Sequence, residues 1–123
     1  MTFQYKDAFV TLAAVEFETL VRFYTQLLHQ EPSSYRENVY AEFQLGRFQV
    51  GIFKPKVMHQ AEFENAAGSS MSLCLEVEDL EGAIAHLTRL GYPPPGKIIT
   101  TSHGREIYAY DPANNRLIVH QSN

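Results

Sequence analysis

The sequence predicts an α+β fold made of two βαβββ modules. Two segments, residues 9–28 and 72–91, carry the same pattern when Val10 is aligned with Leu73. In each segment apolar residues first alternate with period two and then recur with helical spacing, which is typical of a strand that runs into a helix. Short alternating runs follow each segment and complete modules over residues 8–54 and 71–121. The chain, 1–123, is therefore predicted as a single domain of two modules joined by a linker over 55–70.

The first module is expected to hold one helix and four strands. Alternation predicts strands over 8–15, 35–36, 40–45 and 48–53, and helical spacing predicts a helix over 16–30. Pro32 ends this helix, and Gly46 and Arg47 form the tight turn of a hairpin. The expected apolar face of the helix consists of Leu20, Phe23, Tyr24, Leu27 and Leu28. The segment that follows has no clean period and contains the sequence AAGSS, so we expect a linker that carries a mobile loop.

The second module repeats this order. Strands are expected over 71–77, 97–101, 106–110 and 116–121. Asp79 is the expected N-cap of a helix that runs to about residue 90, and Gly91 lies just past its end. The sequence DPANN, residues 111–115, predicts a turn because proline fixes φ and asparagine tolerates positive φ.

Composition and charge exclude several classes of function. The 123 residues carry a net charge of −4, whereas binding to nucleic acid phosphates requires a basic face. No apolar run is long enough to cross a membrane, and the first residues do not resemble a signal peptide. The single cysteine, Cys74, cannot form an intrachain disulfide. We therefore expect a soluble cytoplasmic protein without nucleic acid or membrane partners.

Three stretches of sequence resemble the vicinal oxygen chelate superfamily. They are VEFETLVRFYTQLL, VEDLEGAIAHLTRLGY and EIYAYDPANNRLIV, with the Phe23-Tyr24 pair and the turn from Tyr108 to Pro112 as the more specific parts. The superfamily includes glyoxalase I, fosfomycin-resistance enzymes, extradiol dioxygenases and bleomycin-resistance proteins. The resemblance covers nearly the whole chain. It implies paired βαβββ modules whose mixed sheets curl around a cleft, usually in a homodimer.

The resemblance also implies a divalent metal held by His, Gln or Glu side chains, and this chain departs from that pattern. The matching positions are Phe9, Ser72 and Ile118, with a fourth match at Gln49 or Gly51. Divalent ions require several convergent oxygen or nitrogen donors, which these residues do not supply. The departure leaves the branch that binds a ligand without a metal. We expect no cofactor, no metal-binding residue and no catalytic residue.

Strand alternation identifies the residues that face the expected cleft. The apolar residues of each strand should face the helices, so the residues between them point the opposite way. The candidate ligand-binding residues are Phe9, Tyr40, Gln49, Phe53, Cys74, Glu76, Tyr108, Tyr110, Ile118 and His120. This mixture of aromatic surface and a few polar groups is typical of small-molecule sites.

Three functional hypotheses follow from these features. The first is metal-free binding of a partly aromatic or amphipathic small molecule, for which Glu42 and Glu76 could attract a cationic group. The second is a metal-dependent lyase, isomerase or dioxygenase that uses other ligands, in which at least three of Glu42, Gln49, Glu76, His103 and His120 would converge. The third is a degenerate scaffold that acts through protein contacts. The sequence alone leaves open whether any catalysis occurs and whether the cleft forms within one chain or between two.

Overall fold

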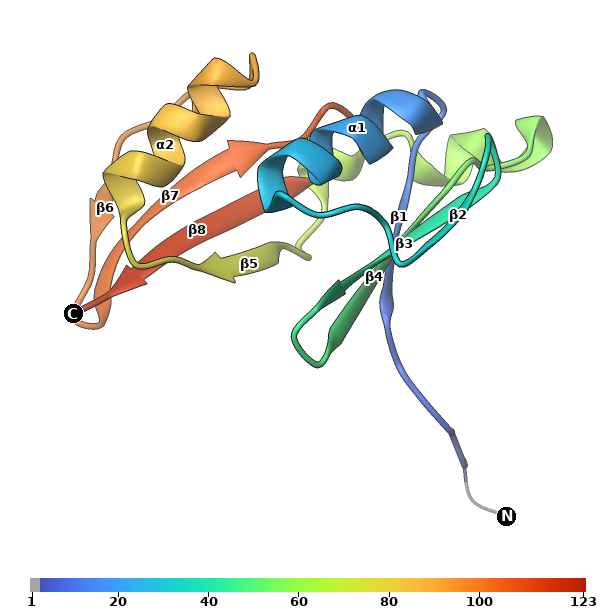
Figure 1. Cartoon of the computed structure of the whole chain (residues 1–123), viewed down its shortest axis with the longest axis horizontal. Coiled ribbons are helices and arrows are strands. Elements are labelled where there is room, and N and C mark those ends of the chain that lie inside the picture. Colours follow the sequence, from blue (N-terminus) through green and yellow to red (C-terminus); the bar gives the residue numbers. More distant parts are fainter. Residues whose placement is uncertain (1–2) are drawn as a thin grey trace.

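The computed structural model describes residues 3–123 and consists of two βαβββ modules (Figure 1). The elements of the first module are β1 (Val10–Ala13), α1 (Phe17–Leu28), β2 (Ser34–Arg36), β3 (Tyr40–Leu45) and β4 (Phe48–Phe53). The elements of the second are β5 (Leu73–Glu76), α2 (Leu80–Arg89), β6 (Ile99–Thr100), β7 (Gly104–Tyr110) and β8 (Arg116–Ser122). The predicted α+β class and module order are confirmed.

Each module forms one mixed sheet, and the two sheets have the same topology. The strand orders are β1-β4-β3-β2 and β5-β8-β7-β6. The first strand of each module runs parallel to the last, which places Val10 opposite Val50 and Leu73 opposite Leu117. The remaining pairs are antiparallel. The equivalence of Val10 and Leu73 inferred from the sequence pattern is therefore also an equivalence in space.

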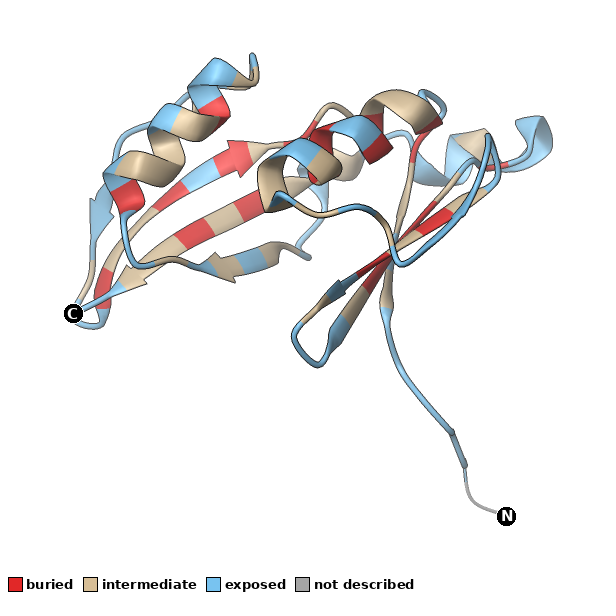
Figure 2. Cartoon of the chain, in the orientation of Figure 1, coloured by how far each residue is buried: buried red, intermediate tan, exposed pale blue. Residues whose placement is uncertain are grey.

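The two helices lie on the same side of the molecule and cover one face of each sheet (Figure 1). Alternate residues of the strands are buried beneath them, as the banding in Figure 2 shows. The buried apolar residues of both modules form one continuous cluster, which includes Phe17, Leu20, Phe23, Phe43, Ile52, Leu80, Leu87, Ile107, Leu117 and Val119. The faces that point away from the helices are only partly covered.

Contacts between the modules centre on α1. The Tyr24 hydroxyl donates a buried hydrogen bond of 2.6 Å to Asp111, which precedes the turn into β8. The Phe23 ring packs edge-to-face on Tyr92, with ring centroids 5.2 Å apart. Because these contacts pair aromatic and polar groups across the module boundary, they fix the orientation of α1 against the second sheet.

Helix α2 has the expected cap, whereas α1 does not. The Asp79 side chain accepts a hydrogen bond of 3.0 Å from the backbone N–H of Gly82, as predicted for an N-cap. Glu16 precedes α1 without any side-chain cap bond. The buried face of α1 also differs from expectation, because Phe17 and Val21 are buried while Leu27 and Leu28 are only partly covered. The last turn of α1 reaches the edge of the core.

The segment between the modules is more regular than predicted. It contains two 3-10 helices, η1 (Val57–Phe63) and η2 (Ala66–Gly68), where the sequence suggested a loop without structure. Their side chains show no apolar period because neither helix has a buried residue. Strands β1, β5 and β6 are shorter than predicted. In β1 and β5 the apolar alternation continues past the last strand residue, to Ala14 and Val77.

The N-terminal segment extends away from the rest of the chain (Figure 1). Residues 3–9 are all exposed, including the aromatic side chains Phe3, Tyr5 and Phe9. Within residues 3–123, neither α1 nor α2 has the length and apolar character that crossing a bilayer requires.

Candidate functional site

The outer face of the first sheet carries a polar network built on Glu42. The Tyr40 hydroxyl donates to one Glu42 carboxylate oxygen at 2.7 Å, and the Gln49 amide donates to the other at 2.9 Å. Burial, followed by the hydrogen bond to Glu42, raises the pKa of Tyr40 to about 12. The Tyr40 ring lies over Gly51, where an added Cβ would approach its hydroxyl to 2.6 Å. Both Glu42 oxygens are thus already hydrogen-bonded within the sheet.

The other predicted residues of this module lie at the margins of the same face. Phe53 is half-buried and packs edge-to-face on Phe63 of η1, with ring centroids 5.4 Å apart. Phe9 lies just before β1 and is 50% exposed. The register supports the expected orientation, because Phe53 pairs with Tyr40 and Gly51 pairs with Glu42.

The outer face of the second sheet carries a histidine–carboxylate pair. His120 Nδ1 lies 2.8 Å from Glu76 Oε1, and the backbone N–H of Ser122 donates to Glu76 Oε2 at 2.8 Å. The hydrogen bond with His120, followed by that from Ser122, lowers the pKa of Glu76. The structure brings together two residues that the sequence had placed on one face without pairing them.

The remaining predicted residues of the second module form a row beside this pair. Ile118 lies between Cys74 and Tyr108, because β8 pairs with β5 on one side and with β7 on the other. Cys74 and Tyr108 are exposed, and Ile118 and Tyr110 are partly covered. Tyr110 pairs with Arg116 at the opposite end of the strands from His120. The ten predicted residues therefore divide between the outer faces of two separate sheets.

The positions that match the superfamily's metal ligands do not fit a metal. Phe9 and Ile118 have no donor atom, and Ser72 Oγ accepts a hydrogen bond of 2.7 Å from Arg116 Nε. Thr11 and Cys74 are equivalent positions of the two modules. Thr11 pairs with Gly51 and Cys74 pairs with Ile118, so Gly51 is the residue of the first module that corresponds to Ile118. Across residues 3–123 no three His, Cys, Asp or Glu side chains converge in a way that could hold an ion.

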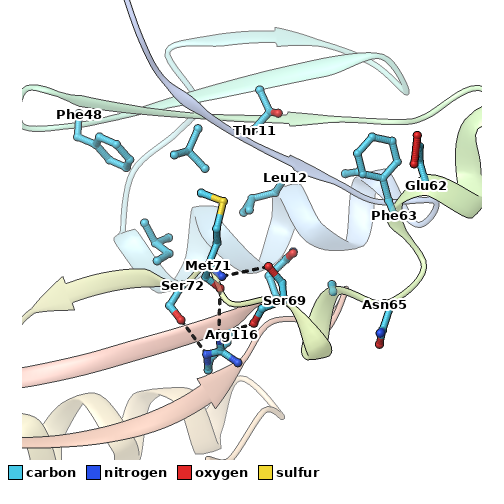
Figure 3. A pocket seen from close by; sticks show the side chains of 15 residues that line it. Thr11, Leu12, Phe48, Glu62, Phe63, Asn65, Ser69, Met71, Ser72 and Arg116 are labelled. Atoms are coloured by element: carbon cyan, nitrogen blue, oxygen red, sulfur yellow. Dashed lines mark hydrogen bonds between the residues drawn. The ribbon is translucent and has the colours of Figure 1, made fainter.

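A cavity of about 350 Å³ lies where the two modules and the linker meet (Figure 3). It is bounded by β1, by the start of the second module and by η1 and η2. Its apolar lining comes from Val10, Leu12, Ala13, Phe48, Phe63, Ala66, Met71 and Leu73. Its polar lining comes from Thr11, Glu62, Asn65, Ser69, Ser72, Asn115 and Arg116. The cavity is therefore mostly apolar, with polar groups on several of the elements that line it.

Arg116 is the cation fixed at this cavity. Its Nε donates to Ser72 Oγ, and its Nη2 donates to the backbone oxygens of Ser69 at 2.6 Å and Met71 at 3.3 Å (Figure 3). The Ser69 hydroxyl in turn accepts from the backbone N–H of Met71 at 3.1 Å. These bonds tie the end of the linker to the start of β8, so the guanidinium is held in one place.

None of the ten predicted ligand-binding residues lines the cavity. Their neighbours Thr11, Ala13 and Ser72 do line it. Sequence reasoning missed Arg116, Met71 and Phe63. Arg116 is the first residue of the strand predicted over 116–121, directly after the DPANN turn, and the pattern gave it no role in a site. The linker residues carried no periodic signal. Only the folding of the linker back against β1 brings them together.

Comparison with known proteins rests on structure. No protein-family model matches the chain, and no curated protein matches its sequence. The chain is similar to a glyoxalase/bleomycin resistance protein from Catenulispora acidiphila, with a TM-score of 0.70 and 21% identity over 95% of this chain and 98% of that one. It is also similar to a bleomycin resistance determinant encoded on the transposon Tn5, with a TM-score of 0.68 and 18% identity over 97% and 99% of the two chains.

A third similar structure is a fosfomycin resistance protein from Mesorhizobium loti, with a TM-score of 0.71 and 16% identity over 98% of this chain and 95% of that one. At these identities the similarity establishes the fold. The chain has the fold of the glyoxalase and bleomycin-resistance proteins, which is the fold of the vicinal oxygen chelate superfamily, and the resemblance inferred from its sequence is confirmed at this level.

Proposed function

We propose that this protein binds a small amphipathic organic molecule without a metal ion, in the cavity between its modules. The observation that carries the proposal is the cavity itself. Its volume of about 350 Å³ falls within the range of roughly 300–1,000 Å³ typical of small-molecule sites. Its mostly apolar wall with a few placed polar groups is the usual lining of such a site.

Binding is favoured over catalysis by the chemistry of the lining. The cavity lining includes no histidine and no cysteine, and its ionisable groups are Glu62 and Arg116. Nucleophilic catalysis requires a nucleophile beside a base, and among residues 3–123 no hydrogen bond joins Glu62 to Thr11, Ser69 or Ser72. Among the proteins of similar structure are resistance proteins for bleomycin and for fosfomycin, which is consistent with a fold used to hold small molecules.

The outer faces of the two sheets would form a second part of the site. We propose that the protein is a cytoplasmic homodimer and that a second copy covers these faces. The ten residues identified by strand alternation would then line a cleft with aromatic surfaces and two internally bonded polar groups, Glu42 and Glu76. Under this proposal one chain forms the cavity by itself, whereas the cleft at the sheet faces requires the second copy.

The proposal can be tested with a fluorescent amphipathic probe, 1-anilinonaphthalene-8-sulfonate. Thr11 is exposed and lines the cavity, so Thr11→Phe should place a ring in the cavity without disturbing the core. We expect wild-type protein to enhance the probe's fluorescence and Thr11→Phe to abolish at least the tightest binding phase. The matched control is Thr100→Phe, which places the same ring at an exposed strand position on β6, outside the cavity. Equal binding by both variants would contradict the proposed site.

A further inference from the structure

Arg116 is a cation without a carboxylate partner at the wall of an apolar cavity. Within residues 3–123 the ion pairs are Arg105 with Glu81 and His120 with Glu76, and neither involves Arg116. Its guanidinium donates to neutral oxygens only, through Nε and Nη2. In the described part of the chain, Nη1 donates to no protein group. Two N–H groups of a positioned guanidinium therefore remain available to an acceptor.

The position of this cation is fixed before any ligand arrives. Three hydrogen bonds hold Arg116 against Ser69, Met71 and Ser72, so a ligand would not have to immobilise a flexible side chain. The two remaining N–H groups both belong to Nη1, so this nitrogen can donate a charge-assisted hydrogen bond to a carboxylate oxygen, and such a bond is stronger than one to a neutral acceptor. Such pre-organisation removes part of the entropic cost of binding.

The acidic side chains of the described residues offer no matching site for a cation in this cavity. Glu42 and Glu76 do not line it, and both carboxylate oxygens of each are hydrogen-bonded within their own sheet. Glu62 lines the cavity, but it lies beside Phe63, whereas Arg116 lies beside Ser72 and Ser69 (Figure 3). A ligand with one charged end can therefore place a negative group at Arg116 and keep it away from Glu62.

We infer that the ligand of this cavity is an amphipathic monocarboxylate whose carboxylate is bound by Arg116. Its apolar body lies against Leu12, Phe48 and Met71. This inference rests on the proposed binding function and specifies the class of ligand. It makes Arg116 the residue that selects carboxylates over neutral and cationic molecules of the same shape.

The test compares three unbranched probes with eight carbon atoms each: octanoate, 1-octanol and octylammonium. Isothermal titration on the full chain should give at least tenfold tighter binding of octanoate than of 1-octanol, a ratio that corresponds to about 1.4 kcal/mol. Octylammonium should bind more weakly than either. Arg116→Gln should remove the preference for octanoate and retain affinity for 1-octanol. The control Glu62→Gln, which removes the other charge of the cavity, should leave octanoate affinity unchanged or raise it.

The outcomes separate this inference from the function on which it rests. Equal affinity of wild-type protein for octanoate and 1-octanol, or a preference for octylammonium, would overturn the inference and leave the binding function standing. Failure of all three probes to bind would overturn both. Because Arg116 also anchors the linker, circular dichroism and the melting temperature of Arg116→Gln must show a folded protein. If that variant does not fold, the order of affinities of the wild-type protein for the three probes still tests the inference.

Discussion

Asp111 is fully buried, and its carboxylate is surrounded by donors. The Tyr24 hydroxyl donates to one oxygen, while the backbone N–H groups of Ala113 and Asn115 donate to the other, each at 2.9 Å. The Asn115 amide adds a bond of 2.9 Å to the oxygen that Tyr24 contacts. A buried carboxylate is tolerated only when it is hydrogen-bonded in this way. One residue thus stabilises the turn into β8 and also joins it to α1.

The Tyr24–Asp111 bond predicts a loss of stability at high pH. Burial, followed by the charge and hydrogen bond of Asp111, raises the pKa of Tyr24 well above its ordinary value of about 10. At a pH between about 10 and the raised pKa, the unfolded chain releases the tyrosine proton, whereas the folded chain keeps it. The free energy of unfolding should therefore fall as the pH rises from about 10 through the folded-state pKa.

We expect Tyr24→Phe to reduce the slope with which the free energy of unfolding falls as the pH rises. Urea unfolding from neutral pH upward measures this slope. Some slope will remain, because the pKa of Tyr40 is raised too. The control is Tyr5→Phe, which removes an exposed hydroxyl and should leave the slope unchanged. A Tyr24→Phe variant with the wild-type slope would show that the buried bond does not exist in solution.

A second prediction for a single residue concerns the stability lost when Gly104 is replaced. This glycine begins β7 with φ of +154°, and a Cβ at this position would lie 2.1 Å from the backbone oxygen of Gln121. Because that oxygen belongs to a paired strand, it cannot move aside as a side chain would. Gly104→Ala should lower the free energy of unfolding by at least the roughly 1–3 kcal/mol that such a backbone conformation costs a residue with a side chain.

The matched control for this variant is Gly96→Ala. Gly96 has no atoms within 4 Å of an added Cβ, so its replacement should change stability little. Chemical denaturation of the two variants side by side measures the difference. Equal stability would mean that β7 and β8 do not pair at this end.

At the scale of elements, the two helices differ in the capping of their N-termini, and this difference predicts unequal effects of mutation. Asp79 caps α2 through the Gly82 N–H, whereas Glu16 makes no such bond at α1. Asp79→Ala should therefore destabilise the protein by about 1 kcal/mol, the typical value for a lost N-cap. Glu16→Ala should be close to neutral. A larger loss for Glu16→Ala in thermal unfolding would contradict the assignment of the caps.

The elements also show how far sequence patterns reach. The bounds of β3 and β4 were predicted as observed, because apolar residues recur at every second position in both strands and a tight turn separates them. Strand β1 was predicted too long, since the apolar alternation continues to Ala14, past the last residue of the strand. The 3-10 helices of the linker gave no signal, because exposed helical turns need no apolar period.

For the whole molecule, the uncovered sheet faces predict self-association. Phe9 and Tyr108 are exposed on or beside these faces, and the N-terminal segment adds Phe3 and Tyr5. Exposed apolar side chains in such numbers are typical of an interaction surface. Sedimentation equilibrium should give a mass twice that of one chain. A monomer at every concentration would contradict the proposed homodimer and leave the sheet faces open to solvent.

The whole molecule also carries the prediction about metals. The positions of the superfamily's ligands hold Phe9, Ser72 and Ile118, so we expect elemental analysis to find no stoichiometric metal. The protein should be incubated with Zn²⁺, Ni²⁺, Mn²⁺ and Fe²⁺ and then desalted. Retention of one ion per chain would favour the alternative of a metal-dependent lyase, isomerase or dioxygenase whose ligands come from two chains. Glyoxalase and dioxygenase assays would then follow.

The sequence by itself determined the two modules, their strand and helix order and which side of each strand is buried. These properties depend on local periodicity, which a chain carries in its order of residues. It also determined that Phe9, Ser72 and Ile118, which match the superfamily's ligand positions, are not the His, Gln or Glu ligands of that superfamily. Only the tertiary structure decided that Glu76 pairs with His120, that Tyr24 bonds Asp111 and that the linker folds against β1 to enclose a cavity beside Arg116. These contacts join residues far apart in the chain, and their partners are set by how the modules pack, which no local pattern records.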